Sequence, residues 1–243
     1  MSIVKVFAAA FAALLLAIAK QTFQNGGTTA GFDYVRQENK GQVLQQTYTP
    51  GYTGRYHSEV DHNQGYQRGD ELFYGFMFRL SSTWEFDQQS YNIVQFIADR
   101  PGAGCDDDDW MPSSLIWLEG NQLNSRIVSG NYRQPDCSRT FTGTGNIATV
   151  SAGVWHKVII QAKWASDSPG YYKMWFDGNK VYEHYNIATT TNDDAVFAFR
   201  VGLYANGWHD DKKMVGNQGF RQVWYDEVAV GTIFADVDPD QYD

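Results

Sequence analysis

Hydrophobic and polar residues alternate with a period of two along much of the chain, which is the pattern of half-buried β-strands. The segment "VWHKVIIQAKW" (154–164) alternates clearly, while "ELFYGFMFRL" (71–80) is almost continuously apolar, as in a strand buried on both faces. The segment "YYKMWFDGNKVYEH" (171–184) holds an Asp-Gly-Asn turn between two such runs and predicts a β-hairpin. Further strands are predicted at 91–98, 195–205 and 220–231.

The spacing of these elements predicts the fold class. Turn residues separate the strands, and no long segment beyond the N-terminal one has the period of a helix. Many strands in one chain of 243 residues predict an all-β fold. We expect a β-sandwich of the jelly-roll, concanavalin-like type with a concave substrate cleft. Because there is no internal repeat or linker, residues 20–243 are predicted to form a single domain.

The first segment is predicted to lie outside this domain. Residues 1–19 combine one lysine, an apolar run and Ala17-Ile18-Ala19, as in a secretory signal peptide. An N-terminal anchor is the alternative. Cleavage removes Lys5 and no acid, so the formal charge changes from −9 to −10. We therefore expect a secreted, extracellular protein, without membrane contact after cleavage because no other apolar stretch spans a bilayer.

Composition narrows the function classes. The acidic charge and the absence of a basic aromatic stripe give no sign of nucleic-acid binding. The two cysteines, Cys105 and Cys137, predict one disulfide in a secreted chain. A metal site or a thiol nucleophile built from this pair is less favoured.

Several charged or polar residues occupy strand positions where a core would be apolar. In "GRYHSEV" (54–60), Arg55, His57 and Glu59 share one face of an extended chain. His57 is a surface imidazole, a metal ligand or a general base. Gln95 lies inside an apolar strand, either as a satisfied core amide or as a donor that faces a cleft.

The segment "FRVGLYANGWHDD" (199–211) raises the same question. Arg200, Gly202 and Tyr204 share a face, and the glycine leaves room for a ligand above the sheet. A stacked surface pair of Arg200 and Tyr204 is the alternative. Asn206-Gly207 then predicts a turn.

Two acidic stretches were weighed for other chemistry. "CDDDDWMP" (105–112) lacks the spacing of an EF-hand, so a solvated acidic loop is favoured over a calcium site. Glu85-Phe86-Asp87 begins like the E-x-D-x-E strand of retaining β-glucanases, but position 89 is Gln. The stretch therefore lacks the full carboxylate set of a glycosidase.

His57, Gln95 and Tyr204 together carry a resemblance to a known family. The chain resembles the family 20 polysaccharide lyases, the glucuronan lyases, which are secreted β-jelly-roll enzymes. The similarity runs through seven blocks in order: "GRYHSEV", "GDELFYGFMFRL", "NIVQFIADR", "WHKVIIQAKW", "YKMWFDGNKV", "RVGLYANGW" and "WYDEVAVG". It implies β-elimination across β-1,4-linked glucuronic acid.

The resemblance also implies roles for these residues. Gln95 donates its amide to the uronate carboxylate, with Arg55 or another arginine assisting. Tyr204 is the acid, and it becomes the base only if a cation such as Arg200 or Arg55 lowers its pKa. His57 is the rival base, and Glu59 positions an arginine or the histidine.

An acidic protein that binds a polyanion needs a local positive strip. The candidates are Arg55, Arg79, Arg126, Lys173 and Arg200, with Trp110, Trp117 and Trp208 as flat faces for sugar rings or as core aromatics. We expect an acidic polysaccharide as the substrate, a monomer, and no cofactor for the chemistry. A structural calcium held by Asp226 and backbone carbonyls of the N-terminal segment is a further expectation.

Three alternatives stay open at this point. A protein of this fold could instead cleave another uronate polymer, such as alginate, by β-elimination. It could also bind sugar without catalysis as a lectin-like module. A hydrolase of neutral β-glucan needs two cleft carboxyls, for which only Glu85, Asp87 and Glu59 are available.

Overall fold

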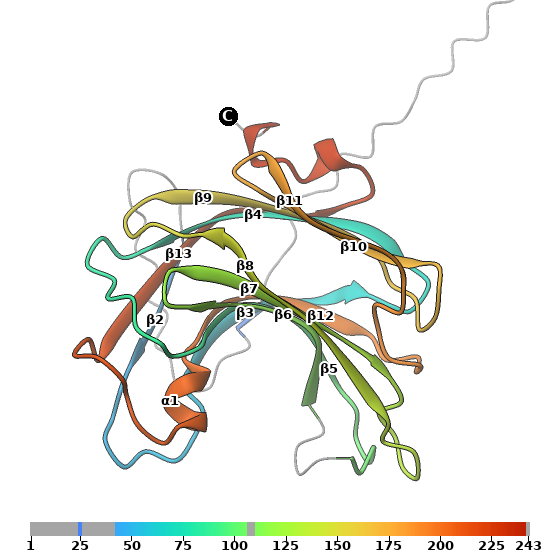
Figure 1. The fold of residues 1–243 in the computed structure, drawn as a ribbon, viewed down its shortest axis with the longest axis horizontal. Helices are drawn as coiled ribbons and strands as arrows, with labels where there is room; N and C mark the ends of the chain where they lie inside the picture. Colours follow the sequence, from blue (N-terminus) through green and yellow to red (C-terminus); the bar gives the residue numbers. More distant parts are fainter. Residues whose placement is uncertain (1–23, 26–41, 106–109, 242–243) are drawn as a thin grey trace, which may run out of the picture.

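Two antiparallel β-sheets stacked face to face make up the computed structural model, which describes residues 24–25, 42–105 and 110–241 (Figure 1). In spatial order, the seven-stranded sheet contains β1 (Gln24–Asn25), β3 (His57–Tyr66), β12 (Phe197–Tyr204), β5 (Tyr91–Asp99), β6 (Trp110–Glu119), β7 (Gln122–Gly130) and β8 (Arg139–Thr149). The six-stranded sheet contains β11 (Asn179–Ile187), β10 (Gly170–Phe176), β9 (Trp155–Lys163), β4 (Glu71–Leu80), β13 (Phe220–Gly231) and β2 (Gln42–Thr47).

Helical structure in the described residues is confined to short segments. They are α1 (Asn206–Asp210), η1 (Phe234–Asp236) and η2 (Pro239–Gln241). The turn predicted at Asn206-Gly207 is in fact the start of α1. The all-β sandwich predicted from the sequence is confirmed.

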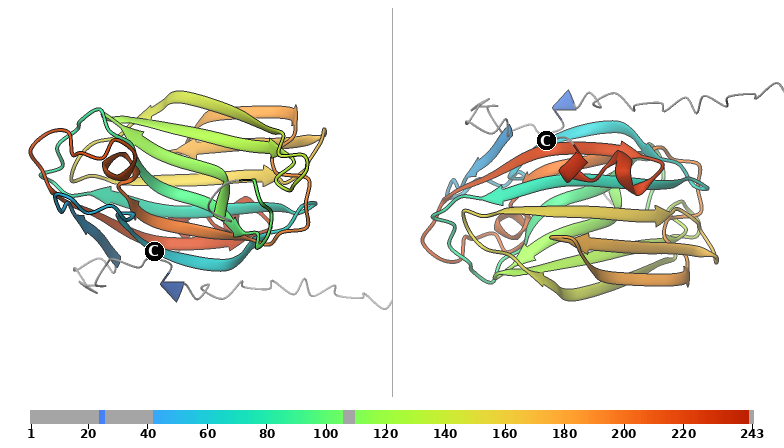
Figure 2. Two further views of the ribbon diagram at one scale, coloured as in Figure 1. Left: turned by 90° about the horizontal axis from the view of Figure 1, so that it is seen from below. Right: turned by 90° about the horizontal axis from the view of Figure 1, so that it is seen from above.

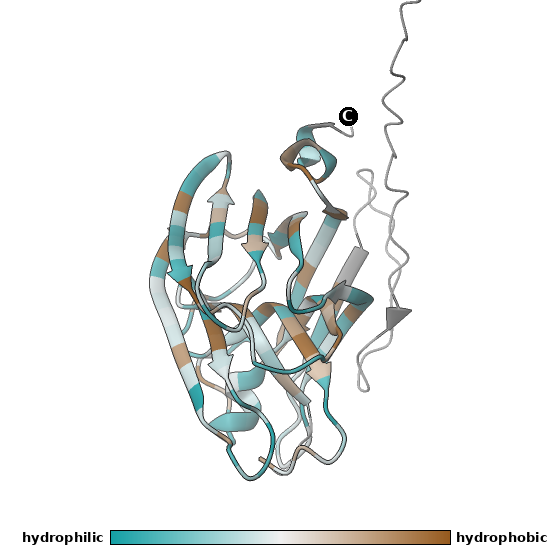
Figure 3. Cartoon of the chain, turned by 90° about the vertical axis from the view of Figure 1, so that its right-hand side faces the viewer, coloured by the Kyte–Doolittle hydropathy of each residue, from teal (hydrophilic) through white to brown (hydrophobic). Residues whose placement is uncertain are grey.

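The core lies between the two sheets, because alternate residues of each strand point into that space. In β4 the inward residues are Tyr74, Phe76, Phe78 and Leu80, which are all fully buried. Figure 3 shows the corresponding alternation of hydrophobic and hydrophilic bands along the strands. The residues between the inward ones point to the outer face of their sheet.

The predicted hairpin at 171–184 is confirmed as β10 and β11. Its turn residues Asp177 and Gly178 both have positive φ angles, 48° and 78°. Such a pair matches the right-handed twist of the flanking strands.

The seven-stranded sheet is curved, with its concave side away from the six-stranded sheet (Figure 1). Helix α1 lies at one side of this concave face (Figure 1). Figure 2 shows the concave face from below, with β9, β10 and β11 on the opposite side of the molecule.

Two further expectations were compared with the described residues. The disulfide Cys105–Cys137 is present, with its Cα atoms 5.5 Å apart. Within the described ranges, no helix has the length and apolar character that crossing a membrane requires. The expected signal peptide (1–19) and most of the acidic loop (106–109) lie outside the described residues.

Candidate active site

Five cross-strand partners form a first line across the concave face, which we call the His57 row. The partners are His57 on β3, Tyr204 on β12, Asn92 on β5, Trp117 on β6 and Asn124 on β7. Directly opposed residues in antiparallel strands project from the same side of a sheet. Their sequence neighbours, such as Leu203 and Leu118, are buried in the core. The row therefore faces away from the core.

A second line, the Gln95 row, runs beside the first. It consists of Asp61 on β3, Arg200 on β12, Gln95 on β5, Leu115 on β6 and Arg126 on β7. Three strands remote in the sequence thus bring His57, Tyr204 and Gln95 to one place. This grouping was implied by the family resemblance and not by the strand patterns.

Glu59 lies between the two rows and connects them. It is 1 % exposed, and its Oε1 atom accepts a hydrogen bond of 2.5 Å from Nε2 of Gln95. Its Oε2 atom is 3.1 Å from Nδ1 of His57 and 3.6 Å from Nη1 of Arg200. A single buried carboxylate therefore orients an amide, an imidazole and a guanidinium.

The placement of Glu59 requires a glycine on the neighbouring strand. Glu59 is the cross-strand partner of Gly202. A Cβ at Gly202 would come within 2.7 Å of Cγ of Glu59 and 2.4 Å of the Ser58 carbonyl oxygen. The space that Gly202 leaves is thus filled by Glu59 and the β3 backbone, and the expectation of open room for a ligand there was wrong.

The contact with Glu59 determines the tautomer of His57. An ionised carboxylate only accepts hydrogen bonds, so Nδ1 of His57 carries the proton and donates it. Nε2 is then the nitrogen of a neutral His57 ring that can accept a proton. The side chain of His57 is 15 % exposed, so a ligand on the concave face can reach it.

Tyr204 is arranged as a proton donor. Its ring centroid is 5.7 Å from that of His57, and its hydroxyl oxygen accepts a hydrogen bond of 2.7 Å from Nη1 of Arg55. Burial raises the pKa of Tyr204 above its ordinary value, and Arg55 opposes this rise only in part. Tyr204 therefore stays protonated at neutral pH, and the idea that a nearby cation makes it a base finds no support in its pKa.

Arg200 is tied to carboxylates rather than directed at open space. Its Nε and Nη2 atoms donate to Asp61 at 2.5 and 2.9 Å, and the side chain is buried. Glu59 and Asp61 raise the pKa of Arg200 against the effect of burial. The role of Arg200 is to balance the charge of these two acids.

Arg126 and Trp117 extend the concave face toward β7. Trp117 is half-buried in the His57 row, and Arg126 is stacked on the ring of Phe141 at 5.1 Å. Burial lowers the pKa of Arg126, and the nearby charge of Arg139 adds to this effect. The Nε atom of Arg126 is buried and has no hydrogen-bond partner.

Two predicted substrate-binding residues lie on the other sheet. Arg79 of β4 is placed between the rings of Trp155 and Trp224, at 5.2 and 4.9 Å. Lys173 of β10 contacts the ring of Tyr171 at 4.4 Å. Both alternate with core residues and so occupy the outer face of the six-stranded sheet. The structure does not bring them to His57 and Tyr204.

The three candidate tryptophans differ in their exposure to solvent. Trp208 of α1 is 1 % exposed and packs in the core against Tyr48, Tyr56 and Tyr91. Trp110 is 47 % exposed, and the guanidinium of Arg200 lies 5.6 Å from its ring. Trp110 and Trp117 are thus the tryptophans available to a sugar, and Trp208 is a core residue.

Asp226, the expected calcium ligand, pairs with Met77 on the six-stranded sheet. Its Oδ1 atom accepts a hydrogen bond from the backbone N–H of Glu227. Among the described residues there is no group of three or more His, Cys, Asp or Glu side chains that could hold a metal. The carbonyls that would complete the site belong to the N-terminal segment outside the described ranges, so the calcium stays a prediction.

The acidic pair weighed for a hydrolase has another role. Asp87 is buried and accepts hydrogen bonds from Arg221, from the Tyr91 hydroxyl and from the Gln89 backbone. Glu85 accepts a hydrogen bond from the Asn217 backbone. None of these hydrogen-bond partners belongs to either row.

Sequence reasoning missed four members of the rows: the apolar Leu115 and the polar residues Asp61, Asn92 and Asn124. Each of the polar three is buried in a strand, and Asn92 directly precedes an apolar run. The sequence signal for these polar residues was therefore the same as for Gln95, namely a polar side chain inside a strand. Their alignment with His57 and Gln95 depends on the register of four strand pairs.

Comparison with known proteins gives the following matches. A family model described as "Polysaccharide lyase" matches residues 18–229. The crystal structure of an endo-β-1,4-glucuronan lyase from the fungus Trichoderma reesei is 64 % identical, with a TM-score of 0.82, covering 91 % of this chain and 100 % of that one. A search of curated proteins returned no match.

More distant structures share the fold alone. A family 7 alginate lyase in complex with substrate has a TM-score of 0.54 at 10 % identity, covering 85 % of this chain and 83 % of that one. The binding domain of botulinum neurotoxin DC has a TM-score of 0.50 at 11 % identity, covering 88 % of this chain and 44 % of that one. Because one of these is a lyase and the other a binding domain, the fold does not decide the activity.

Proposed function

Because this chain belongs to the polysaccharide lyase family, we propose that it is a glucuronan lyase. It cleaves β-1,4-linked glucuronic acid polymers by β-elimination and leaves 4,5-unsaturated uronate ends. One observation carries the proposal: His57, Gln95 and Tyr204 meet around the buried Glu59 on the concave face. The 64 % identity with the Trichoderma reesei enzyme supports glucuronan as the substrate.

The reaction needs three things, which these side chains supply. The C5 proton of a uronate is weakly acidic, and its removal gives an enolate-like dianion, so the carboxylate must be neutralised. A base must reach C5, and an acid must reach O4 of the leaving sugar. In this proposal His57 is the base, Tyr204 is the acid and Gln95 binds the carboxylate.

The proton and electron movements balance with these roles. Nε2 of His57 takes the C5 proton, and the electrons of the C5–H bond form the C4=C5 double bond. The C4–O4 bond breaks, and O4 takes the proton from the Tyr204 hydroxyl. The site is left as imidazolium and phenolate, and proton exchange with water restores both groups.

In the hydrogen bonds among the described residues, Gln95 uses one of its two side-chain amide hydrogens. Its Nε2 atom carries two hydrogens, and Glu59 accepts one of them. The second is the donor that we assign to the uronate carboxylate. Arg55 is exposed at the edge of the site, where its charge serves both Tyr204 and the substrate.

The remaining expectations follow the same proposal. Arg126 is the cation that we assign to a second uronate carboxylate along the concave face, which counters the net charge of −9. Side chains alone carry the chemistry, without a cofactor. The disulfide fits an oxidising, extracellular location, and a monomer suffices because one chain provides every proposed group.

The test mixes purified protein with de-acetylated glucuronan and follows ultraviolet absorbance together with reducing ends. Elimination raises both signals. Reducing ends without absorbance would indicate a hydrolase, and polymer binding with neither signal would indicate a lectin. Absorbance on alginate but not on glucuronan would change the assigned substrate.

A further inference from the structure

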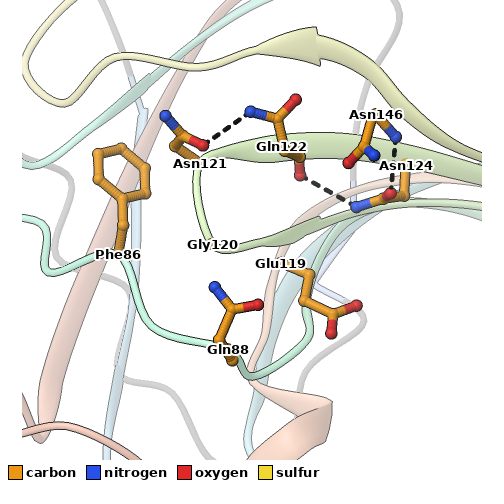
Figure 4. Close-up of a pocket in the computed structure, with 8 residues that line it drawn as sticks. All are labelled: Phe86, Gln88, Glu119, Gly120, Asn121, Gln122, Asn124 and Asn146. Carbon is orange, nitrogen blue, oxygen red and sulfur yellow. Dashed lines mark hydrogen bonds between the residues drawn. The ribbon is translucent and has the colours of Figure 1, made fainter.

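A pocket of about 490 Å³ opens beside the β6–β7 hairpin, at one end of the concave face (Figure 4). Five amide side chains line it: Gln88, Asn121, Gln122, Asn124 and Asn146. Phe86, which is 36 % exposed, stands at one side of it. The roles proposed above for the catalytic site use none of these residues.

The pocket continues the His57 row. Asn124 is both the last member of that row and a wall of the pocket. Tyr204 lies on β12 and Asn124 on β7, which are three strand spacings apart. At ~4.8 Å for each spacing, the pocket begins about 14 Å from the proposed acid. A polysaccharide lying across the strands reaches it a few sugar units from the scissile bond.

The charge of the pocket differs from that of the catalytic site. Among the described residues that line it, none is Lys, Arg or His, and Glu119 adds a carboxylate. A uronate carboxylate placed there would lose water without gaining a cation, and Glu119 would repel it. Amides offer both donors and acceptors, which matches hydroxyl groups.

The inner wall is held in place before any ligand binds. Oδ1 of Asn124 accepts a hydrogen bond of 3.1 Å from the Asn146 backbone, and its Nδ2 donates to the Gln122 carbonyl at 3.0 Å. A Cβ at Gly145 would lie 3.2 Å from the same Oδ1 atom. A fixed wall lowers the entropy cost of binding. Gln88 is exposed and Gln122 half-buried, so both can be changed without disturbing the core.

We propose that this pocket is a distal subsite that binds the hydroxyl-bearing edge of a pyranose and leaves its carboxylate in solvent. The amides take the hydroxyls, and Phe86 offers an apolar face to the ring. Successive units of a β-1,4-linked chain turn opposite edges to the protein. Some units therefore present their hydroxyl-bearing edge to the pocket and their carboxylate to solvent. The substrate part of this inference rests on the proposed function.

The test is the double variant Gln88→Ala/Gln122→Ala, made in a Tyr204→Phe background so that glucuronan oligosaccharides stay intact. Calorimetry should show about tenfold weaker binding of long oligosaccharides and unchanged binding of a trisaccharide. The loss should be the same at low and high NaCl, because the lost contacts are uncharged. Gln67→Ala, an exposed amide in the β3–β4 turn, is the matched control and should change nothing.

Unchanged binding of long oligosaccharides in the double variant would overturn the subsite. A loss confined to low salt would show that the pocket binds charge, which also overturns the proposal. A neutral β-1,4-linked glucose tetrasaccharide separates this inference from the proposed function. It should shift the side-chain amide NMR signals of Gln88 and Gln122 even if the protein fails to cleave glucuronan, and unshifted signals contradict the subsite.

Discussion

The Nη1 atom of Arg55 lies 2.7 Å from the hydroxyl oxygen of Tyr204 and donates a hydrogen bond to it. This contact occupies a lone pair of the phenol oxygen and leaves its proton free for a substrate. Burial raises the pKa of Tyr204 more than Arg55 lowers it. Because the effect of burial is the larger one, Tyr204 stays a neutral proton donor beside His57.

Removal of this hydroxyl should stop the reaction. Tyr204→Phe should lower kcat by about 10²–10⁴-fold, because O4 loses its proton donor while the ring keeps its place. Glucuronan binding, measured by calorimetry, should stay nearly unchanged. Tyr185→Phe, which removes an exposed hydroxyl from the other sheet, is the control. A fully active Tyr204→Phe enzyme would rule out the acid role.

The raised pKa of Tyr204 also sets an expectation for alkaline pH. A phenol that must be protonated loses activity when the pH exceeds its pKa, which here lies above the ordinary value of about 10. The kcat profile should therefore show no loss from this group up to pH ~10. An alkaline limb centred near pH 8 in the wild-type enzyme would mean that another group is the acid.

Glu59 is a positioning residue, and Glu59→Gln tests it. The variant keeps the shape but loses the charge that fixes the proton of His57 on Nδ1 and orients Gln95. We expect kcat to fall by about 10²-fold. The ring nitrogen NMR signals of His57 should show that its proton is no longer confined to Nδ1, because the charge that favours it there is lost.

Asp61→Asn is the matched control for Glu59. It removes the other carboxylate bound to Arg200. Among the described hydrogen bonds, none joins Asp61 to His57. The ring nitrogen NMR signals of His57 should change less in Asp61→Asn than in Glu59→Gln. Equal changes in the two variants would mean that Glu59 acts through general charge rather than through its contact with the ring.

The sequence predicted which residues share a face of one strand, but not what lies next to that strand. Alternation placed Arg55, His57 and Glu59 together, and the structure agrees. The same alternation gave Arg79 and Lys173 an outward position without showing that their sheet is the one remote from the site. Burial and strand order are properties of the whole fold, so a single-strand pattern does not contain them.

Register is the second limit. The two rows depend on a register shift in β5 between Asn92 and Val94 and on one in β12 between Val201 and Tyr204. An extra residue in a strand changes which side chains line up with its neighbours. The strand β8 was not predicted, since half-buried and exposed residues dominate it. The amide pocket beside the β6–β7 hairpin, which also includes Asn146 of β8, was therefore not predicted from the sequence.

Arg126 should matter for binding and not for the chemical step. Arg126→Gln removes a cation from the Gln95 row, so KM for glucuronan should rise about tenfold while kcat stays within twofold. The salt dependence of KM should decrease as well. Arg79→Gln and Lys173→Gln, on the other sheet, serve as controls with unchanged KM. A rise in KM for the controls equal to that for Arg126 would point to a second binding face.

The disulfide should stabilise the fold without taking part in catalysis. Cys105 and Cys137 are 32 residues apart in sequence, which corresponds to roughly 3–4 kcal/mol on the chain-entropy model. Cys105→Ala/Cys137→Ala should therefore lower the urea midpoint, with kcat at 25 °C kept because neither residue belongs to a row. An unchanged midpoint would show that the bond does not constrain the unfolded chain.

Buried tyrosines should make the protein sensitive to alkali. Burial raises the pKa of Tyr172 to about 12 and holds the pKa values of Tyr74 and Tyr225 well above their ordinary value. Above pH ~10 the unfolded chain releases phenolic protons that the folded chain retains, so the unfolding free energy falls as pH rises. Each such tyrosine contributes about 1.4 kcal/mol per pH unit.

Urea unfolding between pH 9 and pH 11 measures this loss of stability. The unfolding free energy should be nearly constant below pH 10 and fall steeply above it. Tyr172→Phe should reduce the slope by the contribution of one phenol, because the ring still fills the core. A slope identical to that of the wild type would mean that Tyr172 ionises within the folded protein, which contradicts its burial at 0 % exposure.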